Sequence, residues 1–296
     1  MAPRFMAERQ RVDTPASPEN VDLIPFIKAH ETAMFLTVED KKIFAYTANR
    51  PFDATKRSIV FVHGAANDHS VWALQSRYFA YHGWNAFAID LPGHGKSASP
   101  PCPSISAAAD WVAHLLDAIG APTADLVGHS MGSLIALEAA ARHPTRISRI
   151  ALIGTAVPMA VSETLLDASQ ANDHAAYEMI NVFAHSNAAQ LGGNRVPGMW
   201  MMGSAMRLME RSGDGVLHAD FSACNAYANG LEAAQKMRIP TLMILGKRDL
   251  MTPMKIAADV ISNLPDVKVV ALDGAGHSLM AEKPDEVLDN LIAFFS

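Results

Sequence analysis

Runs of apolar residues alternate along this chain with segments that have the composition of amphipathic helices. Strands that are apolar on both faces belong in a parallel sheet that helices cover on both sides. The strands expected on this basis are 58–64, 84–90, 124–127, 147–154, 239–246 and 267–274. The helices expected between and after them are 71–81, 106–119, 131–142, 253–264 and 284–296.

The order of these elements predicts the fold class. Strands that alternate with helices form an α/β protein with a doubly wound, mostly parallel sheet. Ahead of this repeat, residues 34–38 and 42–47 read as two strands joined by a tight polar turn. Residues 1–33 are mostly rich in Pro, Glu, Arg and Asn without clear periodicity, which predicts a loosely ordered N-terminal arm.

The repeat is interrupted between residues 155 and 235. This stretch is rich in Met, Ala, Asn and His, contains no obvious strand and reads as several short helices. An insertion of this size within an α/β repeat is most simply a helical cap. We therefore expect a core made of residues 34–154 and 236–296, with the cap, residues 155–235, inserted between the two parts.

One turn between a strand and a helix has an unusual composition. In the stretch GHSMG, Gly128 and Gly132 stand two residues before and after Ser130, between an apolar strand and a helix. Glycine has no Cβ, so it permits close approach of backbones and strained dihedral angles. The pattern predicts a sharp turn that presents the Ser130 hydroxyl at the edge of the sheet.

An acid and a histidine are expected at the same edge. The carboxyl ends of parallel strands meet there, and active sites of open α/β sheets gather at that edge. Asp249 follows one late strand and His277 follows the next, so both should converge on Ser130. A serine nucleophile needs an adjacent base, which His277 can supply. Asp249 would hold the imidazole in the required tautomer.

These motifs, in this order, resemble the α/β-hydrolase superfamily. The resemblance rests on the GHSMG turn, the Ser–Asp–His order, and the segments HGAAN and DLPGHGKS after two of the predicted strands, and it covers residues 34–296. It implies the α/β-hydrolase fold and a serine hydrolase in which Ser130, Asp249 and His277 are catalytic. It also implies an oxyanion hole formed by the backbone N–H groups of Ala65 and Met131.

The residue at the nucleophile position narrows the chemistry. Dehalogenases and epoxide hydrolases of this superfamily use aspartate there, so Ser130 favours cleavage of a carboxylic ester, or of a related lactone or thioester. Carbon–carbon bond hydrolases of ring-fission products are an alternative. They often carry asparagine before the serine and an arginine in the cap, where this chain has His129 and the candidates Arg195 and Arg207. A small-molecule receptor derived from a hydrolase is the other alternative.

Substrate contacts are expected beside the nucleophile and in the cap. His63 and His129 adjoin the oxyanion loop and Ser130, where each either touches substrate or supports the loop. The cap stretch 196–211 combines several methionines with Trp200. Methionine fills irregular apolar space, so Trp200 and Met202 either belong to the cap core or line a pocket for a small to medium, mostly apolar acyl group.

Composition narrows the partners and the compartment. The net charge of −6 and the pI near 6.0 give no basic field for nucleic acid or an anionic membrane. No metal-ligand spacing or phosphate-binding glycine loop occurs, so we expect no metal and no cofactor. Cys102 and Cys224 are the only cysteines and are expected as free thiols.

No targeting signal is apparent. The first 20 residues contain no continuous apolar segment, and no run of 18 apolar residues follows. These absences favour a cytoplasmic protein that acts on a small-molecule acyl substrate. A homodimer is left open.

Overall fold

The framework is one eight-stranded sheet with the strand order β1-β2-β4-β3-β5-β6-β7-β8. Strands β3 to β8 run parallel to one another, whereas β1 pairs antiparallel with β2 and β2 antiparallel with β4. The computed structural model describes residues 33–193 and 198–296. The predicted N-terminal arm therefore lies outside the described residues except for Ala33.

The strands occupy the predicted positions. Their bounds are β1 Ala33–Val38, β2 Lys41–Tyr46, β3 Ser58–Val62, β4 Asn85–Ile89, β5 Ala124–His129, β6 Ile147–Ile153, β7 Thr241–Gly246 and β8 Val267–Leu272. Strands β3, β4, β5 and β7 are buried along their whole length, which is why apolar residues dominate each of them in the sequence.

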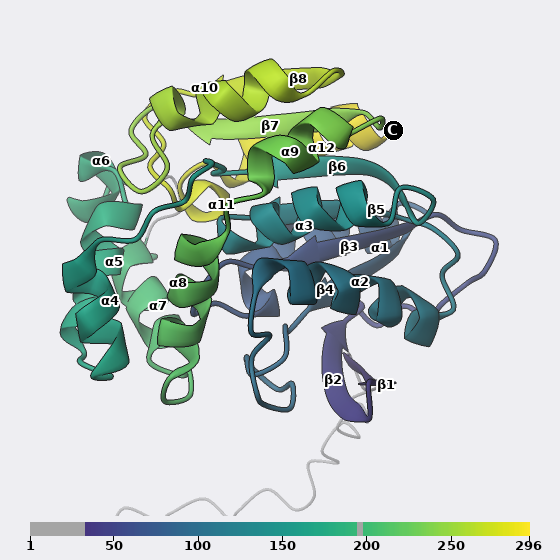
Figure 1. Cartoon of the computed structure of the whole chain (residues 1–296), viewed down its shortest axis with the longest axis horizontal. Helices are drawn as coiled ribbons and strands as arrows, with labels where there is room; N and C mark the ends of the chain where they lie inside the picture. The colour runs from purple at the N-terminus through teal and green to yellow at the C-terminus, as the bar shows by residue number, and fades with distance from the viewer. Residues whose placement is uncertain (1–32, 194–197) are drawn as a thin grey trace, which may run out of the picture. The chain divides into compact units, whose positions relative to one another are not determined.

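Two layers of helices enclose the sheet. One layer is α2 Ile105–Ile119, α3 Met131–Arg142, α9 Gly230–Lys236 and α10 Met254–Asn263, and the other is α1 Ala73–Tyr81 and α12 Pro284–Phe295 (Figure 1). Alternate residues of β3 divide between them: Val60 and Val62 belong to the core under the first layer, and Ile59 and Phe61 to the core under the second. The predicted fold class, a doubly wound and mostly parallel α/β sheet, is confirmed.

Between β6 and β7, the described part of the chain contains helices and loops but no strand. They are α4 Glu163–Gln170, α5 Ala175–Ala184, α6 Asn187–Gln190, α7 Met201–Met209, α8 Val216–Ala226 and α9. Leu165, Met209 and Phe221 are members of a small apolar cluster of their own, separate from the two sheet cores. Helices α4 to α8 lie beyond one end of the sheet (Figure 1).

The structure refines two predicted segments. The helix expected over 71–81 begins two residues earlier, with a 3-10 helix, His69–Trp72, because the Asp68 carboxylate accepts a hydrogen bond from the Ser70 N–H and caps it. A further short helix, α11 Leu279–Glu282, was not predicted and follows His277 directly.

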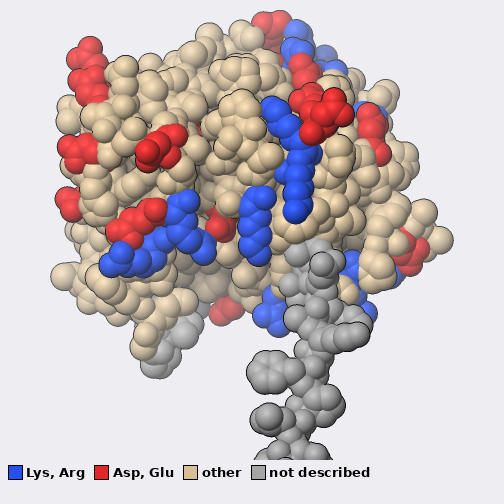
Figure 2. Space-filling view, turned by 90° about the horizontal axis from the view of Figure 1, so that it is seen from below, with Lys and Arg blue, Asp and Glu red and all other residues tan. Residues whose placement is uncertain are grey.

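The charged surface is mixed where it can be seen. On the face drawn in Figure 2, acidic and basic side chains alternate over a largely uncharged surface, outside the part that grey atoms cover. Within residues 33–193 and 198–296, no helix combines the length and the apolar character that a membrane crossing requires.

Candidate active site

Ser130 stands at the sharp turn between β5 and α3. Its φ of 53° and ψ of −122° place a non-glycine residue in a sparsely populated region of backbone conformation. Surrounding hydrogen bonds hold it there: the Ser130 N–H donates to Ile153 O at 2.9 Å, and its own carbonyl accepts from the Ser133 N–H at 2.8 Å. The predicted turn therefore exists and is held rigidly from both sides.

The two glycines beside Ser130 are required by close backbone contacts. A Cβ on Gly128 would collide with the carbonyl of Gly132, the second residue of α3. A Cβ on Gly132 would collide with the carbonyls of Val62 and His63 at the end of β3. The helix can begin directly above the strand ends only because both positions lack a side chain.

Asp249 and His277 form a buried hydrogen-bonded pair. The His277 Nδ1–H donates to Asp249 Oδ2 at 2.8 Å, and the two side chains are about 5% and 1% exposed. The backbone N–H groups of Met251 and Thr252 donate to Asp249 Oδ1 at 2.9 and 2.8 Å, and the Thr252 hydroxyl donates to Oδ2 at 2.7 Å.

These contacts fix the ionisation of the pair. Burial by itself would raise the pKa of Asp249, but the charge and hydrogen bond of His277, with the donors of Thr252, hold that pKa well below its ordinary value. An ionised Asp249 keeps the ring proton of His277 on Nδ1. The Nε2 atom of a neutral His277 is then left with a lone pair that can accept a proton.

The ends of three strands bring Ser130 and this pair together. The Ser130 N–H is bonded to Ile153 O at the end of β6, and the next residue, Gly154, lies against the ring of His277. The His129 Nε2–H donates to His277 O at 2.9 Å. Among the described residues, no hydrogen bond joins Ser130 Oγ to His277 Nε2. Such contacts are often long in free enzymes and shorten when substrate binds.

Two backbone N–H groups beside Ser130 have no acceptor among residues 33–193 and 198–296. Met131 is the first residue of α3, so its N–H has no partner within the helix. In the part of the chain that the structure describes, the Ala65 N–H likewise donates no hydrogen bond. Ala65 and Ser130 line the same cavity. The role of an oxyanion hole, which would need such free donors, stays a prediction for this pair.

His63 is enclosed by the oxyanion loop. Its Nδ1–H donates to Gly64 O at 2.8 Å, and its Nε2 accepts from the Leu91 N–H at 3.1 Å. Burial, and then the nearby charge of His94, lower the pKa of His63 to about 4, so it is neutral. With no exposed surface and both nitrogens in use, His63 supports the loop, which is one of the two roles expected for it.

His129 is also buried and neutral. Burial, and then the neighbouring His277, lower its pKa to about 3. Its Nε2–H is bonded to the His277 backbone, while its ring lines the larger of the two cavities described next. The side chain therefore joins the end of β5 to the His277 loop.

A small apolar cavity, which we call the Ser130 cavity, opens beside the serine. Its volume is about 80 Å³. It is lined by Ala65, Ser130, Met159, Ala160, Val161, Ser162, Leu165, Phe221, Cys224, Met251 and Thr252. One water occupies about 30 Å³ of liquid, so this space admits only a short group.

The two cysteines are free thiols, as predicted. Cys224, in the wall of the Ser130 cavity, is buried, and burial raises its pKa far above the ordinary value. Burial also raises the pKa of Cys102 to about 12. Neither thiol is a nucleophile at neutral pH.

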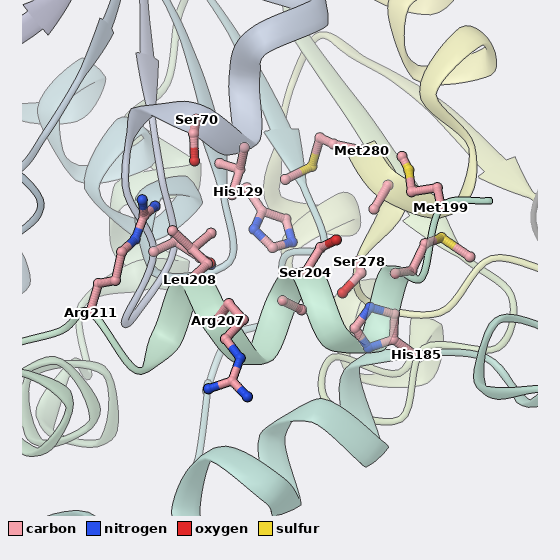
Figure 3. A pocket seen from close by; sticks show the side chains of 15 residues that line it. Ser70, His129, His185, Met199, Ser204, Arg207, Leu208, Arg211, Ser278 and Met280 are labelled. Carbon is pink, nitrogen blue, oxygen red and sulfur yellow. The ribbon is translucent and has the colours of Figure 1, made fainter. Parts of the chain in front are cut away.

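A larger cavity, about 450 Å³, lies between the sheet edge and α7. Figure 3 shows His129 and Met280 facing the helix that carries Ser204 and Leu208. Its size lies within the range of roughly 300–1,000 Å³ that is usual for small-molecule sites. His129 precedes Ser130 and Ser278 follows His277, so this cavity adjoins the candidate catalytic residues along the chain.

The methionine-rich stretch contributes to this cavity through other residues than expected. Trp200 is 70% exposed, and neither it nor Met202 lines the two cavities described here. Met199 and Met201, their chain neighbours, do line the larger one. Of this stretch, Met199 and Met201 form part of the cavity wall in place of the expected Trp200 and Met202.

Of the two arginines considered for a substrate carboxylate, Arg207 lines the larger cavity. Its side chain is largely exposed and pairs with Glu210 at 2.6 Å, so the carboxylate-binding role stays a prediction. Arg195 lies outside the described residues.

One group of residues has ligand atoms close enough for a metal ion. Single oxygen or nitrogen atoms of Asp68, His69 and Asp90 lie within 4.8 Å of one another. The Asp90 carboxylate, however, already accepts from the His69 N–H and ring and from the Lys96 N–H. These contacts favour a loop-organising role for the cluster.

The sequence of this chain matches a known protein family. The family model for the alpha/beta hydrolase fold matches residues 57–284, and the chain belongs to that family. The predicted resemblance to α/β-hydrolases is thereby confirmed.

Curated relatives of similar length are esterases. A pimeloyl-acyl-carrier-protein methyl ester esterase of Neisseria meningitidis is 28% identical over 242 residues, which cover 76% of this chain and 88% of that protein. An enzyme of the same name from Chromobacterium violaceum is 30% identical over 233 residues, which cover 74% and 87%.

Solved structures of esterases are also similar to this chain. A thermophilic esterase has a TM-score of 0.73 and 25% identity, covering 88% of this chain and 96% of that one. An esterase from Exiguobacterium antarcticum has a TM-score of 0.76 and covers 88% and 98%, at 17% identity, which shows a shared fold.

The close contact at the turn can be tested by stability. We expect Gly128→Ala to lower the free energy of unfolding by at least about 2 kcal/mol, because its Cβ would collide with the backbone of α3. Gly213→Ala is the matched control, since Gly213 is exposed and a Cβ there has room, so it should change stability by about 0.5 kcal/mol or less. Urea unfolding of both variants measures the difference. Equal losses would contradict the contact.

Proposed function

We propose that this protein is a serine hydrolase that cleaves a carboxylic ester through an acyl-enzyme on Ser130. The observation that carries the proposal is the position of Ser130: a strained non-glycine residue at a strand–helix turn, beside a buried, ionised Asp249 hydrogen-bonded to His277. The esterases among the relatives support the reaction class.

Each residue of the candidate site has a separate role in this mechanism. Ser130 Oγ attacks the carbonyl carbon while His277 Nε2 takes its proton, and Asp249 stabilises the imidazolium that forms. The N–H groups of Ala65 and Met131 stabilise the oxyanion, an arrangement in which each donor contributes about 3–4 kcal/mol to lowering the barrier.

Collapse of the tetrahedral intermediate breaks the bond to the alcohol oxygen, which leaves with the proton from His277. Water then attacks the acyl-enzyme with the same histidine as base, which releases the acid and restores Ser130.

The two cavities suggest a substrate with one short and one long side. The Ser130 cavity suits a small alcohol such as methanol, and the larger cavity suits a longer, mostly apolar acyl chain. We propose that residues 155–235 act as a cap, because α7 and α8 supply walls of the two cavities. His63 in this proposal supports the oxyanion loop rather than touching substrate.

The nucleophile is tested by Ser130→Ala. We expect kcat on a methyl ester to fall about 10³-fold or more with little change in melting temperature, because the hydroxyl is lost while the turn keeps its shape. Ser262→Ala, at an exposed position, is the control and should retain full activity. Mass spectrometry of the wild type with a slowly deacylating ester should show an adduct on Ser130. Normal turnover by Ser130→Ala would exclude the assignment.

The assignment of the acyl chain to the larger cavity is tested with esters of different acyl chain length. Leu208 lines the larger cavity, and each buried methylene contributes about 0.8 kcal/mol. We therefore expect Leu208→Ala to lower the ratio of kcat/KM for methyl hexanoate over methyl acetate several-fold. Leu191→Ala removes the same atoms from a side chain that is 89% exposed and should leave the ratio unchanged. An unchanged ratio in Leu208→Ala would place the acyl chain elsewhere.

A further inference from the structure

Asp220 is an acid of α8 that no sequence motif singles out and that lies buried against the oxyanion loop. It is 4% exposed. Its Oδ2 atom accepts two hydrogen bonds, from the Ala66 N–H at 3.0 Å and from His94 Nε2 at 2.8 Å. One carboxylate oxygen of the helical segment is thus bonded to the residue that directly follows Ala65.

His94 provides the counter-charge for this carboxylate. Its Nδ1 faces Pro92 O at 3.0 Å and its Nε2 faces Asp220, so both ring nitrogens meet acceptors and both carry protons. Burial by itself would lower the pKa of His94, but the charge and hydrogen bond of Asp220 and the carbonyl of Pro92 raise it above the ordinary value. The pair is a buried ion pair, in which loss of one partner leaves the other charged and unpaired.

The loop that receives this contact needs to be held. Ala66 has a φ of 52°, which is unfavourable for alanine. The turn itself offers only one long bond, from the Asn67 N–H to Gly64 O at 3.3 Å. The contacts from outside are shorter: the His63 ring donates to Gly64 O at 2.8 Å, and Asp220 accepts from Ala66.

These two contacts act on consecutive peptide planes. The carbonyl of Gly64 belongs to the same peptide unit as the Ala65 N–H, so the bond from His63 sets the direction of that N–H. The next peptide unit contains the Ala66 N–H, which is bonded to Asp220. The Ala65 donor is therefore fixed from one side by the core and from the other side by the helical segment.

We propose that Asp220 is a positioning residue for the oxyanion hole: by holding the Ala66 amide, it keeps the Ala65 N–H aimed at the transition state. The inference rests on the proposed function, since it assumes that Ala65 stabilises an oxyanion. It also gives the helical segment a part in the chemistry, because the residue after Asp220, Phe221, lines the Ser130 cavity.

Asp220→Leu is the test, because leucine has a similar size but no oxygen that can accept from the Ala66 N–H. We expect kcat on a methyl ester to fall about 10–100-fold, up to the loss known for a missing oxyanion donor, with KM within about twofold of the wild type. The inhibition constant of a trifluoromethyl ketone, whose adduct carries the oxyanion, should rise by the same factor as kcat/KM falls. Ser222→Ala, on the same helix, is the control and should change neither value.

The outcomes separate the two proposals. Wild-type protein that neither hydrolyses esters nor binds the ketone would refute the proposed function. An active wild type with unchanged kcat in Asp220→Leu, or a fall in kcat without a matching rise in the inhibition constant, would refute the positioning role alone. If Asp220→Leu does not fold, the double variant D220L/H94Q removes the unpaired charge of His94, and the same two measurements on it decide.

Discussion

The structure depends on how closely α3 approaches the ends of β3 and β5. Gly128 lies under the carbonyl of Gly132, and Gly132 lies against the last carbonyls of β3, so no side chain separates the helix from the sheet. This contact forces Ser130 into its strained conformation and aims the N-terminus of α3 at the same point. In the proposed mechanism, the nucleophile and one oxyanion donor thus arise from one packing constraint.

Around this turn, each buried histidine has its protonation defined by its partners. His63 and His129 are held neutral by burial, His94 is held charged by Asp220, and His277 donates from Nδ1 to Asp249. Four histidines within one region therefore have different roles because their hydrogen-bond partners differ. In the proposed mechanism only His277 moves a proton.

The sheet and the turn could be predicted because their physical causes are local. Strands buried on both faces consist mostly of apolar residues, and Gly128 and Gly132 mark a backbone contact that only glycine permits. The cavity walls could not be predicted in the same way. The rotation of α7 decides that Met201 faces the cavity while Met202 does not. Asp220 was missed because its partner Ala66 lies 154 residues away along the chain.

The two thiols have a practical consequence. Because burial raises the pKa of both Cys102 and Cys224, almost no thiolate is present at neutral pH, and thiolate is the form that reacts with maleimides and peroxide. A cysteine introduced on the exposed face of α5 or α7 would therefore react with a maleimide faster than either native thiol. A fluorescent label attached there would report movements of the helical segment.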